Sequence, residues 1–433
     1  MTAALRLANA GRRVTLVERR PYLGGRAYSY VDRETGVQVD NGQHVFMGCC
    51  TAYVELLREV GALGGAARQK RLRVEVHSPE GRGGALTAAP LPAPLHLLLS
   101  FLRYPHMSLR DKFRAVPALL RIRRERDWNR AELRAVSFEE WLRRNGQSDR
   151  AIANFWDLIV VPALNDASRD VSAAMAFMLF QTALLRDAHG ADVGYARSGL
   201  SELMGEPIER RLRERGAKVL LGRTVQRLVV EDGVVTGAAL ADGETLTADW
   251  YVSALPPHAL SGLLPGDLRG APPFDAADAH AYSPIVNLHV WYDRPVADFE
   301  WAAFVDSPLQ FVFNKTRIAG LPGPGDYLTV SLSGAWEWWP LSKEELRERF
   351  TAELARALPR ARSAAIQRFI VVKEQRATFR SLPGGPANRL PARTPLPNLL
   401  LAGDWTDTGW PATMEGAVRS GNAAASVILE AAQ

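Results

Sequence analysis

The feature that most constrains the fold is a helix, a glycine turn and a short strand ending in an acid, all near the N-terminus. Small and apolar residues between positions 3 and 8 predict one helix face, and Asn9-Ala10-Gly11 is typical of a helix C-terminus. The apolar run 14–17 predicts a buried strand that ends at Glu18. This order is that of the second half of a βαβ unit, where the acid binds the ribose of a dinucleotide. A solvated glutamate at a strand end is the alternative interpretation.

The first half of such a unit, a strand followed by a glycine-rich turn, does not precede the helix. Met1 stands about where the third glycine of that turn would lead into the helix. We therefore expect Met1 to be an internal methionine of a longer protein. The alternative is a chain that truly lacks the strand, which would bind its dinucleotide weakly because phosphate donors would be lost.

Two later segments carry the pattern of the same domain. Residues 201–215 predict a helix and 218–221 a strand, and a further apolar strand is predicted at 248–254. Residues 398–402 predict another buried strand, followed by a helix from about Ala412. No segment alone closes a core. The fold class is therefore α/β, with a Rossmann-like domain assembled from residues 1–50, 199–260 and 396–433.

Two insertions separate these segments and are assigned to an α+β substrate domain. Residues 51–198 are predicted to be mainly helical. Residues 261–395 contain strands with alternating apolar residues, among them 285–291 and 327–332, and a helix at 342–358. A second domain of this kind can cover a cofactor and form a substrate cavity.

Charge and cysteine content narrow the function classes. The formal net charge of +6 suits nucleic acid, an anionic membrane or an anionic cofactor. Basic and aromatic residues do not alternate as in a nucleic-acid module, so no nucleic-acid partner is expected. Cys49 and Cys50 are adjacent, which suits a reducing cytoplasm and no metal site. The sequence predicts neither a membrane-spanning helix nor a secretory signal.

A glycine pair follows the acid-ended strand. Gly24 and Gly25 allow the backbone to approach a phosphate closely, and Arg26 can neutralise a pyrophosphate. An ordinary glycine turn is the alternative. The combination of an acid-ended strand with Gly-Gly-Arg less than ten residues later is more specific than either part.

The run VTLVERRPYLGGR at 14–26 and the run NLLLAGDWTDTGWPATMEGAVRSGNAAA at 398–425 resemble the FAD-dependent amine oxidase and phytoene desaturase superfamily. The resemblance implies FAD, with Glu18 on the ribose, residues 24–26 along the pyrophosphate and Asp404 near the ribityl chain. It also implies that a helix N-terminus directs backbone N–H groups at the flavin, where their positive potential stabilises negative charge. The implied cofactor-binding residues are Glu18, Gly24, Gly25, Arg26, Gly42, Gln43, His44, Val225, Gly403, Asp404, Ala412, Thr413, Met414 and Glu415.

The segment Asp40-Asn41-Gly42-Gln43-His44 resembles one branch of that superfamily, the squalene-associated desaturases now understood as hydroxysqualene dehydroxylases. This resemblance implies a long polyprenyl lipid substrate and conversion of hydroxysqualene to squalene by reduced FAD. An acid should protonate the leaving hydroxyl. Asp166, His44 and Glu374 are the candidates, by residue type and position; His44 is alternatively a packed or capping residue.

Other functions stay open at this point. A carotenoid-type desaturase or an amine oxidase could use the same scaffold, and desaturation would run the flavin in the opposite direction. A non-catalytic flavoprotein that binds a lipid or a partner is a further alternative, and the missing glycine loop favours it. The sequence indicates no oligomeric state and no electron donor.

The segment 92–128 combines leucines on one helix face with seven arginines and lysines between 103 and 124. Such helices can lie on an anionic membrane and admit a lipid, so we expect a cytoplasmic protein in peripheral contact with the inner face of the membrane. Core-facing helices with solvated arginines are the alternative.

Overall fold

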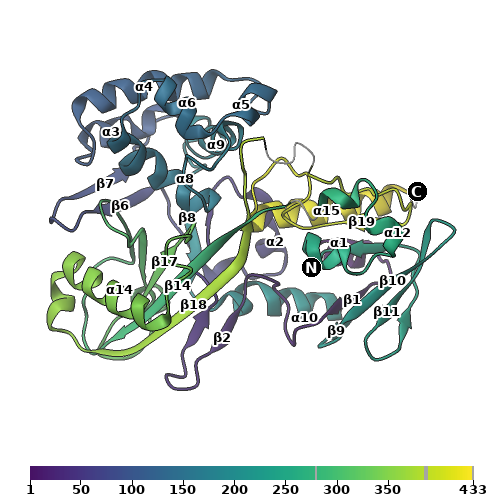
Figure 1. Ribbon diagram of the computed structural model, residues 1–433. Coiled ribbons are helices and arrows are strands. Elements are labelled where there is room, and N and C mark those ends of the chain that lie inside the picture. The colour runs from purple at the N-terminus through teal and green to yellow at the C-terminus, as the bar shows by residue number, and fades with distance from the viewer. Residues whose placement is uncertain (278–279, 385–388, 432–433) are drawn as a thin grey trace.

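The computed structural model describes residues 1–277, 280–384 and 389–431. Its elements form an α/β region, a large mixed sheet and a group of helices (Figure 1). In Figure 1 the helices lie at the top, the large sheet at the lower left and the α/β region at the right.

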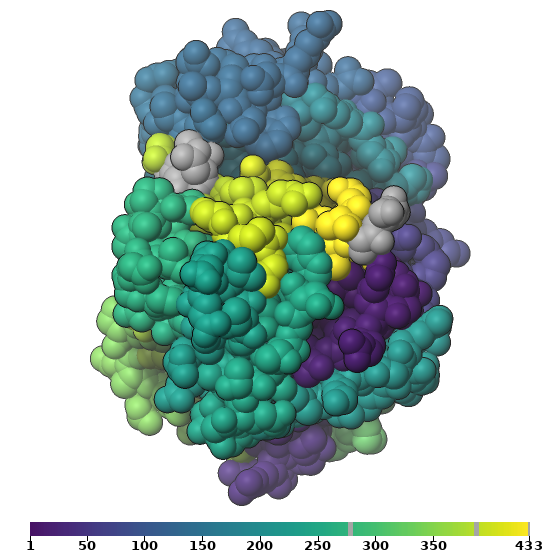
Figure 2. All heavy atoms as spheres, turned by 90° about the vertical axis from the view of Figure 1, so that its right-hand side faces the viewer, coloured from purple at the N-terminus to yellow at the C-terminus, as the bar shows by residue number. Residues whose placement is uncertain are grey.

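The α/β region is built from three segments that are far apart in the sequence. Its elements are α1 (Thr2–Asn9), β1 (Thr15–Glu18), α10 (Glu206–Glu214), β9 (Lys218–Leu221), β10 (Val225–Glu231), β11 (Val234–Leu240), β12 (Thr245–Leu246), β13 (Tyr251–Ser253), β19 (Leu399–Leu401) and α15 (Met414–Ala431). Strand β1 pairs in parallel with β9, and β13 pairs in parallel with β19. Figure 2 shows the N-terminal segment in purple beside the C-terminal segment in yellow. These pairings confirm the predicted fold class.

The two parallel pairs are separate within the part of the chain that the structure describes. No strand there joins β1 to β19. Helices α1 and α15 cross closely beside them, and a Cβ placed on Gly421 would lie 2.7 Å from Cβ of Thr2. Leu5 of α1 and Val418 of α15 belong to one hydrophobic core, which also contains side chains of α2 (Thr51–Glu59). Helix α2 packs here through Tyr53 and Leu57, so residues beyond position 50 also contribute to this core.

The large sheet has seven strands in the order β18-β14-β17-β16-β15-β6-β7. Their bounds are β6 (Arg73–His77), β7 (Gly83–Thr87), β14 (Tyr282–Tyr292), β15 (Trp301–Phe304), β16 (Phe311–Asn314), β17 (Tyr327–Leu332) and β18 (Ile366–Phe379). Alternate residues of a strand point to opposite faces. On β14, Val286 and Leu288 pack against α14 (Lys343–Ala357), whereas Ile285 and Asn287 face a cavity.

The group of helices comes from the first insertion. Its members are α3 (Leu98–Arg103), α4 (Leu109–Arg124), α5 (Ala131–Ala135), α6 (Phe138–Arg144), α7 (Asp149–Ala151), α8 (Asp157–Leu164) and α9 (Ala173–Phe180). Aromatic residues fill their core, including Phe138, Trp156 and Phe180, whose rings lie within 6 Å of one another.

The first insertion is mainly helical, as the sequence predicts, although helices do not fill all of it. It also contributes β6 and β7 to the large sheet, and β5 (Ala66–Arg68) and β8 (Val193–Ala196) to a sheet with β4 (Val45–Met47). These strands are three to five residues long. Partners distant in sequence stabilise such short strands, so local periodicity indicates them poorly. Short elements also lie near the turns, namely β2 (Ser29–Val31), β3 (Gln38–Asp40), α11 (Pro257–Ser261), α12 (Gly266–Arg269) and α13 (Lys315–Ala319).

Candidate functional site

A continuous cavity of about 2320 Å³ runs between all three regions. It is larger than the several hundred Å³ typical of a site for one small ligand. One part follows β1, the 24–27 turn and the start of α15, and the other part extends among α3, α4, α8 and α9. We call these the polar arm and the apolar arm.

The polar arm begins at the strand end that the sequence indicated. Glu18 lines the cavity at the end of β1, and its Oε1 accepts a hydrogen bond from the backbone N–H of Arg20 at 2.8 Å. Gly24 has φ of +128°, and a Cβ there would lie 2.3 Å from the carbonyl oxygen of Ala27. Gly25 also has positive φ, at +59°. The backbone can adopt this turn only with glycine, which brings peptide groups to the cavity surface.

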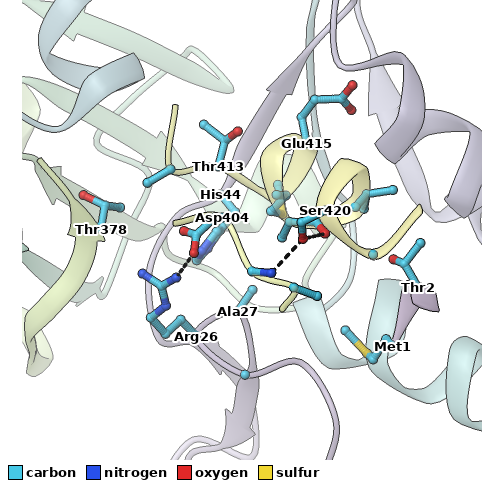
Figure 3. A pocket seen from close by; sticks show the side chains of 18 of the residues that line it. Met1, Thr2, Arg26, Ala27, His44, Thr378, Asp404, Thr413, Glu415 and Ser420 are labelled. Carbon is cyan, nitrogen blue, oxygen red and sulfur yellow. Dashed lines mark hydrogen bonds and ion pairs between the residues drawn. The ribbon is translucent and has the colours of Figure 1, made fainter. Parts of the chain in front are cut away.

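Arg26 connects this turn to the C-terminal segment. Its guanidinium forms an ion pair with Asp404 (Figure 3). It also donates to the carbonyl oxygen of Ala377 at 2.7 Å. Gly403 precedes this acid with φ of +134°, and its N–H donates to Oγ of Ser420 at 2.7 Å. The pair therefore fixes the strand end after β19 against the glycine turn.

The N-terminus of α15 also faces the cavity. Ala412, Thr413 and Met414, which the resemblance assigns to the cofactor, line it. The helix has 18 residues, so its first N–H groups present a substantial positive potential there. Glu415 lines the cavity too, but its carboxylate also accepts from the N–H groups of Ala52 and Tyr53, at 3.1 and 2.7 Å. Glu415 therefore holds the start of α2, a role that the sequence did not indicate.

The segment 40–44 lies at the junction of the two arms. Gly42, Gln43 and His44 line the cavity. Asn287 is buried on β14 and donates to the carbonyl oxygen of Asn41 at 3.3 Å. This residue lines the cavity and was missed from sequence, although a polar residue within the apolar run 285–291 was a signal.

A buried ion pair lies beneath this segment. Nζ of Lys315 is 3.0 Å from Oδ2 of Asp40, and both side chains are more than nine-tenths buried. Oδ1 of Asp40 accepts from the backbone N–H of Leu200 at 3.0 Å. Because each charge is partnered, removal of either one would leave an isolated buried charge.

Burial lowers the pKa of His44, so its imidazole is neutral near pH 7. Its Nδ1 is 2.9 Å from the carbonyl oxygen of Gly42, which can only accept. Nδ1 therefore carries the hydrogen, and Nε2 is left as an acceptor. A neutral His44 suits an orienting contact with a substrate hydroxyl better than proton donation.

The three candidate acids have different surroundings. Glu374, on β18, lines the cavity with His44. Asp166 is 1% exposed and does not line the cavity. Its carboxylate accepts from Nε of Arg380 at 2.8 Å and from Nε1 of Trp336 at 3.1 Å. This placement argues against the acid role predicted for Asp166, which instead joins the helices to the large sheet.

The polar arm fits an elongated polar cofactor. Val225, which the resemblance assigns to the cofactor, lines it together with Ser253 and Thr378. Oγ of Ser253 and Oγ1 of Thr378 are buried and lack a hydrogen-bond partner within residues 1–277, 280–384 and 389–431. Buried hydroxyl groups without partners are costly, so both positions call for a polar ligand. The predicted FAD supplies such groups along its ribityl and phosphate chain.

The apolar arm has a different surface. Its lining is almost entirely aliphatic and aromatic, with Leu72, Leu86, Phe101, Val116, Leu119, Phe155, Leu158, Ile159, Phe180, Leu184 and Val193 among its side chains. Trp301 and Phe313 of the large sheet also line the cavity. An arm of this kind accommodates an apolar chain and excludes water. Across the described ranges, no group of three or more His, Cys, Asp or Glu residues is placed to hold a metal ion.

Comparison with known proteins agrees with this arrangement. The family model described as flavin containing amine oxidoreductase matches residues 1–429. Among solved structures, a putrescine oxidase variant aligns with a TM-score of 0.76 at 19% identity, over 99% of this chain and 96% of that one. Cyclohexylamine oxidase from Brevibacterium oxydans aligns with a TM-score of 0.70 at 18% identity, covering 100% and 97% of the two chains. At these identities the structures show a common fold.

Two curated relatives cover nearly the whole chain. Hydroxysqualene dehydroxylase from Rhodopseudomonas palustris is 29% identical over 440 residues, 100% of this chain and 96% of the relative. The 15-cis-phytoene desaturase from Narcissus pseudonarcissus is 28% identical over 456 residues, 99% of this chain and 77% of the relative.

Proposed function

This chain belongs to the flavin containing amine oxidoreductase family and is an FAD-dependent oxidoreductase, and from that premise we propose that it converts hydroxysqualene to squalene. In this reaction an allylic C–O bond breaks, the oxygen leaves as water after taking up a proton, and a C–H bond forms. The substrate is a long polyprenyl lipid with one polar group.

The observation that carries the proposal is the apolar arm that meets the polar arm at residues 42–44. An isoprenoid chain in the apolar arm would place one polar group beside His44 and Glu374. The relative from Rhodopseudomonas palustris supports this choice, because it is a hydroxysqualene dehydroxylase that is 29% identical over 100% of this chain and 96% of its own length.

FAD, when bound and reduced, supplies the hydride equivalent that the carbon centre requires. The chain contributes binding and orientation. Glu18, Arg26, the glycine turn and the N-terminus of α15 would hold the ribose, pyrophosphate and ring system, because each presents matching hydrogen-bond groups or charge to the polar arm.

His44 and Glu374 act on the hydroxyl group in this proposal. Neutral His44 accepts a hydrogen bond at Nε2 and so orients the hydroxyl. Glu374 donates the proton that turns the hydroxyl into water. The apolar walls keep other water away from the cationic carbon.

A phytoene-type desaturase is the second candidate, because the Narcissus relative is similarly identical. It would use the same apolar arm, but a hydride would leave to oxidised FAD and a proton would leave to a base, so no proton donor would be required beside the flavin. Substitution Glu374→Gln should reduce dehydroxylation at least tenfold, because it removes the proposed proton donor.

The test is direct product analysis. Purified protein with FAD and a chemical reductant is incubated with hydroxysqualene and, separately, oxidised protein is incubated with phytoene. Squalene formation supports the proposal. Yellow protein that desaturates phytoene and leaves hydroxysqualene unchanged would replace it with the second candidate. Yellow protein that turns over neither substrate would point to lipid binding without catalysis.

A further inference from the structure

Most of the exposed large apolar side chains in the described residues occur in one segment, 91–120. Phe113 is 74% exposed and Leu109 is 68% exposed, both on α4. We call this surface the α3–α4 face, and its members are Leu91, Leu95, Leu98, Leu99, Leu102, Leu109, Phe113 and Leu120. An apolar patch of this size on one short segment is typical of an interaction site.

The charges around this face have one sign. The exposed basic residues between positions 91 and 124, where α4 ends, are Arg103, Arg110, Arg114, Arg121, Arg123 and Arg124. None of these six forms an ion pair within the described part of the chain. Asp111 is the one acid between residues 91 and 124. Its side chain is buried, and its carboxylate accepts hydrogen bonds from the hydroxyl groups of Ser108 and Ser148. The face is therefore apolar, and the exposed charges of its own segment are all positive.

The same face forms one end of the apolar arm. Leu95, Leu98 and Leu120 are 50%, 44% and 36% exposed, and all three also line the cavity. The cavity therefore reaches the surface among α3 and α4. In Figure 1 these helices lie at the outer end of the molecule, far from the β2 hairpin.

We propose that the α3–α4 face docks on an anionic lipid bilayer, so that the apolar arm opens directly into the membrane. Leucine and phenylalanine side chains enter the acyl boundary while the arginines contact anionic headgroups. A second copy of the chain fits less well, because a symmetric contact would bring the same arginines together. Docking itself is independent of the substrate, whereas uptake of a polyprenyl lipid through this opening rests on the proposed function.

Vesicle binding tests the docking. The FAD-loaded protein is mixed with vesicles of phosphatidylcholine alone or with phosphatidylglycerol, and bound protein is measured by co-sedimentation at low and high salt. We expect binding that requires phosphatidylglycerol and weakens with salt. The double substitution Leu109→Gln with Phe113→Gln removes two apolar side chains that do not line the cavity, and should lower the partition coefficient about tenfold or more.

A matched control uses the hairpin at the other end of the molecule. Val31 is exposed on β2 and Arg33 is exposed in the following turn. The double substitution Val31→Gln with Arg33→Glu should leave vesicle binding unchanged. Equal binding of all three proteins, or no binding by the unsubstituted protein, would overturn the proposal. Self-association lost only in the Leu109/Phe113 variant would also overturn it, in favour of a second copy.

Measurements of activity then distinguish the proposed membrane docking from the proposed substrate. With hydroxysqualene dispersed in detergent, the Leu109/Phe113 variant should match the unsubstituted protein. With hydroxysqualene embedded in anionic vesicles, the variant should be at least several-fold slower. Turnover in neither format, with vesicle binding intact, would reject the proposed substrate and leave the docking surface standing. Equal rates from vesicles would reject uptake through the α3–α4 face.

Discussion

Arg26 joins the two ends of the chain that form the polar arm. Its partner Asp404 is 7% exposed, and the pair lies between the glycine turn and the strand end after β19. Phe379 also packs below the guanidinium, whose carbon is 5.0 Å from the ring centroid. The charge of Arg26 is thus held in a fixed position at the cavity surface.

Substitution Arg26→Gln should weaken FAD binding by about tenfold to a hundredfold, because a charged hydrogen bond contributes about 1.5–3 kcal/mol. Titration of flavin-free protein with FAD, followed by fluorescence, measures the effect. Arg33→Gln, on an exposed turn, is the control. Unchanged FAD affinity in the Arg26 variant would show that this guanidinium does not contact the cofactor.

His289 lies beneath the same site, and its charge state couples stability to pH. Burial, with the nearby charge of Lys315, lowers the pKa of His289 from 6.5 to about 3. Below pH 6.5 the unfolded chain takes up a proton that the folded chain does not, so the free energy of unfolding should fall as the pH drops from 6.5 toward 3. The slope from this residue is at most about 1.4 kcal/mol per pH unit.

Chemical denaturation at several pH values between 7.5 and 4 measures this slope. Substitution His289→Gln removes the titrating group, so the free energy of unfolding should depend less steeply on pH, even if it is lower throughout. The same slope in both proteins would assign the acid sensitivity to other residues.

At the scale of elements, the crossing of α1 and α15 brings the two chain ends together. It depends on Gly421, where a Cβ would lie 2.7 Å from Cβ of Thr2 and 3.0 Å from the backbone nitrogen of Ala3. Neither neighbour is a flexible side-chain end, so the helices would have to move apart. Both helix starts line the polar arm, through Met1 and Met414.

Substitution Gly421→Ala should therefore destabilise the protein by about 1–3 kcal/mol, despite the higher helix propensity of alanine. Thermal unfolding of the FAD-loaded protein measures it. Gly64→Ala, where nothing lies within 4 Å of the added Cβ, provides the control. A Gly421 variant as stable as the control would mean that the two helices can move apart enough to accept the added Cβ without lowering the stability of the protein.

At the scale of the whole molecule, three regions contribute to one cavity, and the apolar arm determines what it accepts. Ala163 lines this arm at the end of α8 and is partly exposed to it. No helix of the described chain is both long and apolar enough to span a bilayer.

Substitution Ala163→Phe should narrow the apolar arm. It should lower kcat/KM for hydroxysqualene, the proposed substrate, by about tenfold or more, because the lipid chain would be displaced from its bound position. Flavin absorbance should not change, since the polar arm is untouched. Product formation and the flavin spectrum are measured together. Ala352→Phe on the exposed side of α14 is the control. A loss of activity in the Ala163 variant no larger than in the control would exclude Ala163 from the substrate path.

The sequence alone indicated the features that depend on neighbours in the chain. The strand ending at Glu18, the turn at Gly24 and Gly25, and the helix after Asp404 rest on local periodicity and backbone geometry, and the structure has each of them. The helix expected at 342–358 is α14, with Ser342 as its capping residue. Local rules suffice here, because hydrogen bonds and side-chain spacing within a few residues determine these elements.

Only the tertiary structure placed Asn287 beside the segment 42–44 and turned Asp166 toward Arg380, away from the cavity. It also showed that β6 and β7 extend the large sheet, and that the apolar arm reaches the surface at the α3–α4 face. Each of these contacts joins residues far apart in the sequence. The local sequence pattern of a strand shows which residues share a face, but it does not show what that face packs against. The packing of whole elements against one another decides which face meets the cavity.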